Sequence, residues 1–371
     1  MVSEISMKKN SLRHKQLAKV APHFYLKMLL LALIMIFICS IGLFLEYHWL
    51  ENYDAAQPIS AANRYITRLI DKDYDSIYDE ASQITTLFNT KEELNSYLND
   101  KYEYESVNDL YLSEDFACSI NNEDLHCFNI RKSSTETLQT IYTHKVNDQW
   151  LALPQMASNT YTIITSNEDV TLTLNGVTVT SSSTKNNEEI FYSAFDNLDN
   201  TSNLTLYPNY TVKEVISNHP LFGLSNSDYL AVQDAINPVI YVGEKPESET
   251  YLTYQQLLID TAQMYCKYIT ADASLWQLTS LLYPYSEFYD QVRTFENIWF
   301  TDHTSIEFND LSVSNVINLG NDGFLGNIEF DYVVTTEDGN SKVYHTAYQI
   351  TFINSYGRYL ASNIATINTA D

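Results

Sequence analysis

The sequence predicts an α+β protein in which a single N-terminal transmembrane helix precedes two α+β domains that flank a small all-β module. One uninterrupted apolar run at residues 28–45 predicts the membrane helix. Helical and then strand-like periodicity occurs twice in the remaining chain, and only strand and turn signals lie between the two copies. The expected segments are a basic tail (1–27), the membrane helix (28–49), a first α+β domain (55–153), an all-β module (156–243) and a second α+β domain (250–371).

The apolar run is long enough to cross a bilayer. Its eighteen residues, at ~1.5 Å rise each, approach the ~30 Å hydrocarbon core. Lys27 on one side, and Tyr47, His48 and Trp49 on the other, are expected at the membrane interfaces. A cleaved signal peptide is the alternative, but the basic region is long and no A-x-A site follows. We therefore expect a retained anchor.

The charge distribution predicts the orientation. The tail holds six Lys or Arg against one acid, so the positive-inside rule places the N-terminus in the cytoplasm and residues 46–371 outside. Removing these groups from the totals of 21 bases and 47 acids leaves 15 bases and 46 acids, a net charge of −31. So acidic a surface repels phosphate backbones, and we expect no nucleic-acid partner.

Apolar residues at helical spacing predict three helices at the start of the outer part. The first begins at Pro58, which suits a first helical turn. Asp71 to Asp73 interrupt it, a second helix covers 74–81, and Thr90 with Glu93 forms a capping box for a third. Strand-like segments then follow, at 115–118, 126–130, 140–142 and 148–153.

The C-terminal block repeats the order of helices followed by strands, although the two blocks share little identity. Its predicted helices cover 254–269, 275–282 and 288–295, and its predicted strands cover 328–334, 344–352 and 360–367, with a turn at Asp338-Gly339.

The stretch between the two blocks is expected to form a small β-sandwich. The segment 170–179 predicts a hairpin, because the Asn-Gly pair at 175–176 suits a two-residue type I′ turn. This register pairs Leu174 with Val177 on one face. A polar segment at 243–249 links the module to the last domain.

Two parts of the chain resemble a known fold. Residues 62–66 (ANRYI) through 73–78 (DYDSIY), and the last block with its closing strands, look like domains of the nuclear transport factor 2-like fold. The resemblance implies two cone-shaped α+β domains, covering roughly 55–153 and 250–371, and carries no catalytic signature.

In wall-facing proteins of Gram-positive bacteria, such domains recur behind a single anchor. Similar layouts occur in teicoplanin-resistance-associated membrane proteins, in the N-terminal region of methicillin-resistance penicillin-binding proteins and in inner-membrane scaffolds of conjugation systems. The chain departs from the teicoplanin-resistance type because no cysteine-rich zinc ribbon precedes the membrane segment, so a cytoplasmic sensing role is not implied.

Motifs that carry chemistry are scarce. Asp71, Asp73 and Asp75 resemble the start of a calcium loop, but Ser76 and Ser82 occupy its sixth and twelfth positions, so a helix break is the better interpretation. The histidines outside the membrane are too far apart in sequence for a paired-ligand helix. We therefore expect no catalytic residue, no metal and no cofactor.

One histidine could take part in acid/base chemistry. Asp302 and His303, with Glu307, lie near the start of a strand, but a surface loop or an ordinary packed histidine is the favoured interpretation. Cys118 and Cys127 are expected to face each other across a hairpin that turns at 122–123. Their spacing fits a disulfide, and whether they are bridged is left open.

These observations favour a non-enzymatic, membrane-anchored extracytoplasmic binding or scaffolding protein of the cell envelope. Its partner would be an envelope protein or a cell-wall component. An isomerase- or dehydratase-like enzyme with a Tyr and an Asp inside a cone pocket is the alternative, and a structural spacer is a third possibility.

Cys266 is expected to be buried and inert.

Overall fold

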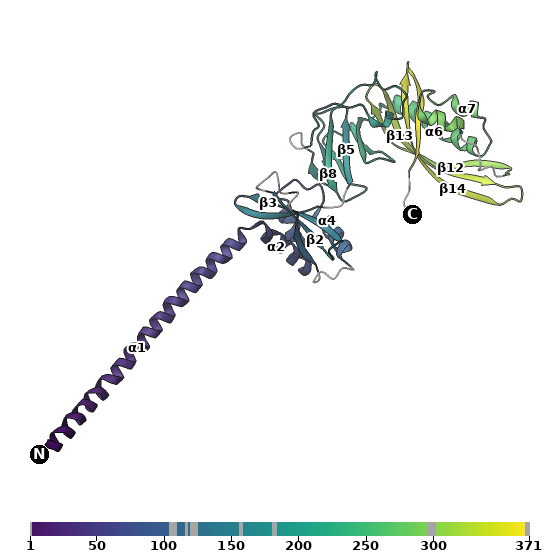
Figure 1. Ribbon diagram of the computed structural model, residues 1–371. Helices are drawn as coiled ribbons and strands as arrows, with labels where there is room; N and C mark the ends of the chain where they lie inside the picture. Colours follow the sequence, from purple (N-terminus) through teal and green to yellow (C-terminus); the bar gives the residue numbers. More distant parts are fainter. Residues whose placement is uncertain are drawn as a thin grey trace. The chain divides into compact units, whose positions relative to one another are not determined.

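The computed structural model describes residues 2–103, 110–115, 118, 125–155, 159–179, 184–294 and 302–367, with side chains described from Phe24 onward (Figure 1). The chain divides into two compact units. The first contains Met1–Thr85 and Tyr104–Gln155, and the second contains Thr86–Glu103 and Met156–Asp371. Each is a mixture of helices and sheets.

A single long helix, α1 (Val2–Ala55), begins the first unit. Its stretch Phe24–Asp54 is long and apolar enough to cross a membrane, and the most apolar 18-residue window within it has a mean hydropathy of 3.0. None of its most apolar stretch is buried inside the protein. This finding confirms the prediction of a helix able to span a bilayer, although the helix extends beyond the predicted 28–49 at both ends.

Two helices of the first unit pack on an antiparallel meander. The predicted break between them is confirmed: Lys72 has a left-handed backbone with φ 55°, and the Asp73 carboxylate accepts a hydrogen bond from the Ser76 amide at 3.3 Å. Tyr65 and Leu69 of α2 are buried. The elements are α2 (Pro58–Asp71), α3 (Tyr74–Ala81), β1 (Tyr111–Glu114), β2 (Leu125–Arg131), β3 (Thr137–Val146) and β4 (Gln149–Pro154), with the sheet order β1-β2-β3-β4.

The first strand lies earlier than predicted. The alternation at 115–118 was expected to form it, but β1 ends at Glu114 and Cys118 lies outside the strands. The amide of Cys118 donates to the Asp115 carbonyl at 3.2 Å, a local turn bond that replaces ladder pairing. Phe116 and Ala117 lie outside the described residues.

The third predicted helix is present but belongs to the second unit. In α4 (Lys91–Tyr102), the capping box of Thr90 and Glu93 is confirmed by hydrogen bonds of 2.7 and 3.1 Å. The Asn175 amide group donates to the Phe88 carbonyl and to the Glu93 carboxylate. These bonds join the start of α4 to the all-β part, so the helix does not group with α2 and α3.

The all-β part is a sandwich of two sheets, as predicted. Asn175 (φ 49°) and Gly176 (φ 80°) form the expected hairpin turn, and Leu174 pairs with Val177. One sheet has the order β10-β11-β5-β8 and the other β7-β6-β9. The strands are β5 (Asn159–Thr165), β6 (Leu172–Leu174), β7 (Val177–Thr178), β8 (Asn209–Val215), β9 (Phe222–Leu224), β10 (Tyr229–Gln233) and β11 (Val239–Glu244), and a short 3-10 helix, η2 (Ser193–Phe195), lies between β7 and β8.

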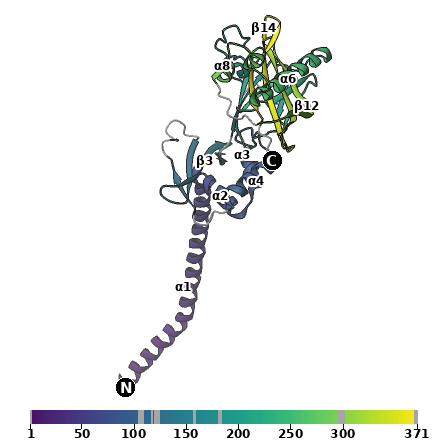
Figure 2. The same ribbon diagram turned by 90° about the vertical axis from the view of Figure 1, so that its right-hand side faces the viewer.

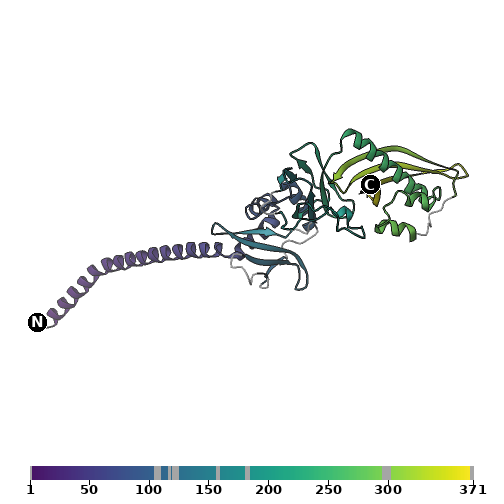
Figure 3. The same cartoon turned by 90° about the horizontal axis from the view of Figure 1, so that it is seen from above.

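In its described residues, the C-terminal part places three helices before a four-stranded antiparallel meander, β12-β13-β14-β15, and α6 lies along this sheet (Figure 2, Figure 3). The predicted turn at Asp338-Gly339 joins β13 to β14. Phe295 of the third predicted helix lies outside the described residues. The elements are α6 (Ser248–Ile269), α7 (Leu275–Thr279), α8 (Glu287–Thr294), β12 (Ser305–Leu319), β13 (Gly323–Thr335), β14 (Ser341–Ser355) and β15 (Arg358–Thr366).

The sequence indicated only the start of strand β12, near Glu307, and its extent to Leu319 was not predicted. It pairs with β13 over most of its length, but the register shifts between Asn309 and Ser312 and again between Ser314 and Ile317. Asp310 and Asn315, each with φ 53°, lie at these two bulges. Each extra residue reverses the alternation of apolar and polar side chains, so the period-2 signal is lost.

The sandwich and the C-terminal sheet share a core. One face of the β10-β11-β5-β8 sheet packs on the other sheet of the sandwich through Ile163 and Ile240. Its opposite face contributes Ile164 and Tyr241 to a cluster that also holds side chains of β12, β13 and β14. The segments predicted as separate domains, 156–243 and 250–371, therefore lie in one compact unit. The C-terminal contributors to this cluster are Ile317, Leu319, Leu325 and Ile353.

Candidate functional site

The predicted membrane-interface residues lie on an exposed helix. Tyr47 and Trp49 are exposed, and the Trp49 ring stacks on Tyr53 with centroids 5.7 Å apart. The His48 ring lies 3.6 Å from the Glu51 carboxylate. Lys27 is also exposed. Side chains of this kind stabilise a helix at the boundary between lipid and water.

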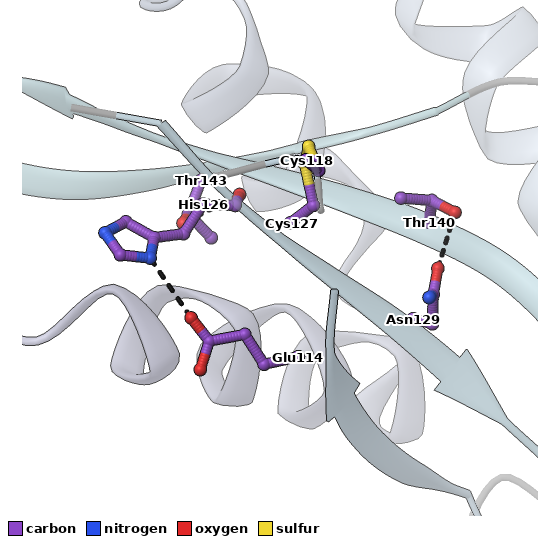
Figure 4. Close-up of a disulfide and its surroundings, with 7 residues drawn as sticks. All are labelled: Glu114, Cys118, His126, Cys127, Asn129, Thr140 and Thr143. Atoms are coloured by element: carbon purple, nitrogen blue, oxygen red, sulfur yellow. Dashed lines mark hydrogen bonds and ion pairs between the residues drawn. A yellow bond between two sulfur atoms is a disulfide. The ribbon is translucent and has the colours of Figure 1, made fainter. Parts of the chain in front are cut away.

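Cys118 and Cys127 are bonded to each other, with Cα atoms 5.9 Å apart (Figure 4). Cys127 lies on β2 and is fully buried. Beside it, the His126 ring lies 3.2 Å from the Glu114 carboxylate, which links β2 to β1. The expected turn at 122–123 lies outside the described residues. The bridge closes a loop with a sequence separation of 9.

Replacing Cys118 and Cys127 by serine should lower the free energy of unfolding by about 2–3 kcal/mol, because a short cross-linked loop restricts the unfolded chain. Chemical denaturation of the full chain in detergent would measure this change. Reductant should reproduce the loss in the wild type and leave the double variant unaffected. Equal denaturation of oxidised and reduced wild-type protein would contradict a structural bridge.

Several tyrosines of the C-terminal part take part in packing and hydrogen bonds. The Tyr254 ring stacks on Phe324 with centroids 3.7 Å apart, and its hydroxyl donates to the Tyr359 hydroxyl at 3.0 Å. The Tyr332 hydroxyl lies 2.7 Å from the Thr270 hydroxyl, and burial raises the pKa of Tyr332 to about 12. These rings fill the space between α6 and the sheet.

The histidine considered for acid/base chemistry contacts a carboxylate of the loop that follows α6. His303 Nε2 lies 3.0 Å from a carboxylate oxygen of Asp272, which was not among the candidate acid/base residues considered from the sequence. Asp272 in turn accepts a hydrogen bond from Thr270 at 2.6 Å. Together with Tyr332, these residues form a chain of hydrogen bonds at the end of α6. In the described part of the chain, no group of three or more His, Cys, Asp or Glu side chains is placed to hold a metal ion.

Cys266 is buried on α6, as predicted. Burial raises the pKa of its thiol to about 12, with a smaller opposing effect from the hydrogen bond to Tyr348. Because the thiolate is the reactive form, we expect a thiol-alkylating reagent to leave Cys266 unmodified in folded protein at neutral pH and to modify it after unfolding. Peptide mass analysis would measure this difference. Rapid modification of folded protein would contradict it.

A cavity in the first unit was not anticipated from the sequence. It has a volume of about 430 Å³ and lies between α2, α3 and β4. The two arginines that line it, Arg64 and Arg68, are four residues apart and so share one face of α2. That spacing was visible in the sequence, but their common partner, Glu80, comes from the next helix.

Glu80 is a buried carboxylate held by three donors. It accepts hydrogen bonds from Arg64 at 3.3 Å, from Arg68, and from the backbone amide of Ala152 at 2.7 Å. Arg64 also donates to the Trp150 carbonyl at 2.6 Å, and Arg68 donates to the Ser76 carbonyl at 3.2 Å. Both guanidinium groups are therefore fixed against α3 and β4 beside the cavity.

Comparison of the chain with protein-family models, with curated proteins and with solved structures gave no match. The functional argument therefore depends on the helix, the cavity and the packing described above.

Proposed function

We propose that this chain is a single-pass membrane-anchored extracytoplasmic protein of the cell envelope that binds or scaffolds a partner without catalysis. The observation that carries the proposal is the exposed apolar stretch within Phe24–Asp54, joined directly to folded units. Water does not stabilise so large an apolar surface, whereas a bilayer does. The basic tail favours a cytoplasmic N-terminus.

Further features support the outside location and the binding role. The Cys118–Cys127 bridge suits an oxidising compartment. The order of three helices and a bent antiparallel meander in residues 250–371 is what a nuclear transport factor 2-like domain would have. Its interior is occupied by packed tyrosines and phenylalanines, which supports a surface binding role over a catalytic pocket. The expected partner is an envelope protein or a wall component.

Protease protection tests the topology. In intact cells stripped of their wall, an added protease should degrade the folded units and leave a short membrane-protected fragment that contains α1. Detergent lysis should remove the protection of the N-terminal tail. Protection of the folded units in intact cells would overturn the outside location.

Photo-crosslinking in the native host tests the binding role. Tyr356 is fully exposed at the turn between β14 and β15, so p-benzoylphenylalanine can replace it without disturbing the core. Leu206, exposed in the all-β part, offers a second position. An adduct with one membrane protein would indicate a complex subunit, and retention with insoluble wall would indicate a wall binder. Absence of any light-dependent adduct at both positions would contradict the proposal.

A further inference from the structure

The cavity of the first unit offers hydrogen-bond donors that the protein does not use. An arginine has five N–H donors. Arg64 makes both of its hydrogen bonds through Nη2, and Arg68 makes both through Nη1. Within the described part of the chain, Nε and Nη1 of Arg64, and Nε and Nη2 of Arg68, make no hydrogen bond. Each guanidinium group is thus held by the protein through one terminal nitrogen, and its other nitrogens remain available to a ligand.

The available groups are accessible and already ordered. The Arg64 side chain is 42% exposed and the Arg68 side chain is 25% exposed, whereas that of Glu80 is 6% exposed. Nε and Nη2 of Arg68 form one edge of its guanidinium, the geometry that binds a carboxylate or a phosphate through two parallel hydrogen bonds. Because Glu80 already holds both guanidinium groups in place, the two arginine side chains lose little conformational entropy when a ligand binds.

The net charge around the cavity gives little preference for an anion, so the preference must come from the guanidinium donors. Two guanidinium groups against the Glu80 carboxylate leave one positive charge in this cluster, in an outer part where 46 acids outnumber 15 bases. Asp79 also lines the cavity, so the lining as a whole is neutral. Recognition therefore depends on direct hydrogen bonds to the guanidinium edges, and chloride, which lacks the matching geometry, should compete poorly.

We propose that this cavity binds the oxyanion group of an extracytoplasmic ligand, a carboxylate or a phosphate, through Arg68 and Arg64. Its volume of about 430 Å³ suits a small molecule or the end of a polymer. The inference rests on the proposed binding role for the location of the ligand, while its chemistry can be tested on purified protein whatever the topology.

The test uses the full chain in detergent micelles with 15N-labelled arginine, which gives six Nε–H signals, one for each arginine. Sodium phosphate and sodium acetate are the probes, with sodium chloride at equal ionic strength as the control. We expect saturable shifts of the Arg64 and Arg68 signals with either probe. Tighter binding of phosphate would indicate a phosphorylated ligand, and tighter binding of acetate a carboxylate ligand. No saturable shift, or the same shift with chloride, would overturn the proposal.

A pair of variants locates the site. Arg64→Lys keeps the charge but loses the Nε and Nη1 donors that have no partner among the described residues, so probe affinity should fall about tenfold. Arg293→Lys, in an exposed i,i+3 contact with Asp290 on α8, is the matched control and should bind like the wild type. Unchanged affinity in a folded Arg64→Lys protein would overturn the assignment. If this variant does not fold, the wild-type titration still decides the proposal.

Discussion

Replacing Glu80 by glutamine should lower the free energy of unfolding of the first unit by about 3 kcal/mol. Removing one partner of a buried ion pair typically costs about 3–5 kcal/mol, because the remaining charges lose their partner but stay desolvated. The lower end applies because both arginines are partly exposed and water screens them. The amide of Ala152 also loses its charged acceptor.

Hydrogen exchange of the amides in α2 and β4, measured at increasing denaturant concentration, would give this loss of stability. The matched control is Glu136→Gln, which removes the same charge from an exposed position in the same unit and should change stability by less than about 0.5 kcal/mol. Equal stabilities of the two variants would show that the cluster around Glu80 contributes little to folding.

Replacing Phe195 by alanine should cost about 3–5 kcal/mol and should weaken two sheets at once. Phe195 is fully buried in the core that the sandwich shares with the C-terminal sheet. Gly323 of β13 leaves space for its ring: a Cβ added there would lie 3.0 Å from Phe195 Cζ and would overlap the Phe352 carbonyl. The lost contacts therefore belong to both parts.

Hydrogen exchange resolved along the chain would test this coupling. Amides of β5 and of β13 should both lose protection in the Phe195→Ala protein and exchange in one cooperative step. The exposed Leu206→Ala variant serves as the control, with protection like the wild type. Unchanged protection in β13 would mean that the C-terminal sheet is an independent domain.

Local features were predictable from the sequence because short-range chemistry determines them. The capping box at Thr90 and Glu93, the break at Lys72 and the turn at 175–176 each depend on side chains within a few residues of one another. The structure places all three where the sequence predicted them.

Long-range pairings were not predictable from the pattern. The bulges at Asp310 and Asn315 removed the alternation that would have shown β12. The grouping of α4 depends on hydrogen bonds from Asn175, more than 80 residues away in sequence. The Glu80 cluster joins two helices and a strand whose proximity no local signal indicates. Tertiary contacts of this kind override what each segment shows by itself.

The two bulges of β12 also affect how the protein behaves among its own copies. β12 is an edge strand, and a regular edge presents a row of unpaired backbone groups to any other strand. The proposed anchoring in a bilayer would confine the copies to a surface and raise their local concentration. Left-handed residues at Asp310 and Asn315 break the edge into short segments, which opposes sheet-to-sheet aggregation where crowding would otherwise promote it.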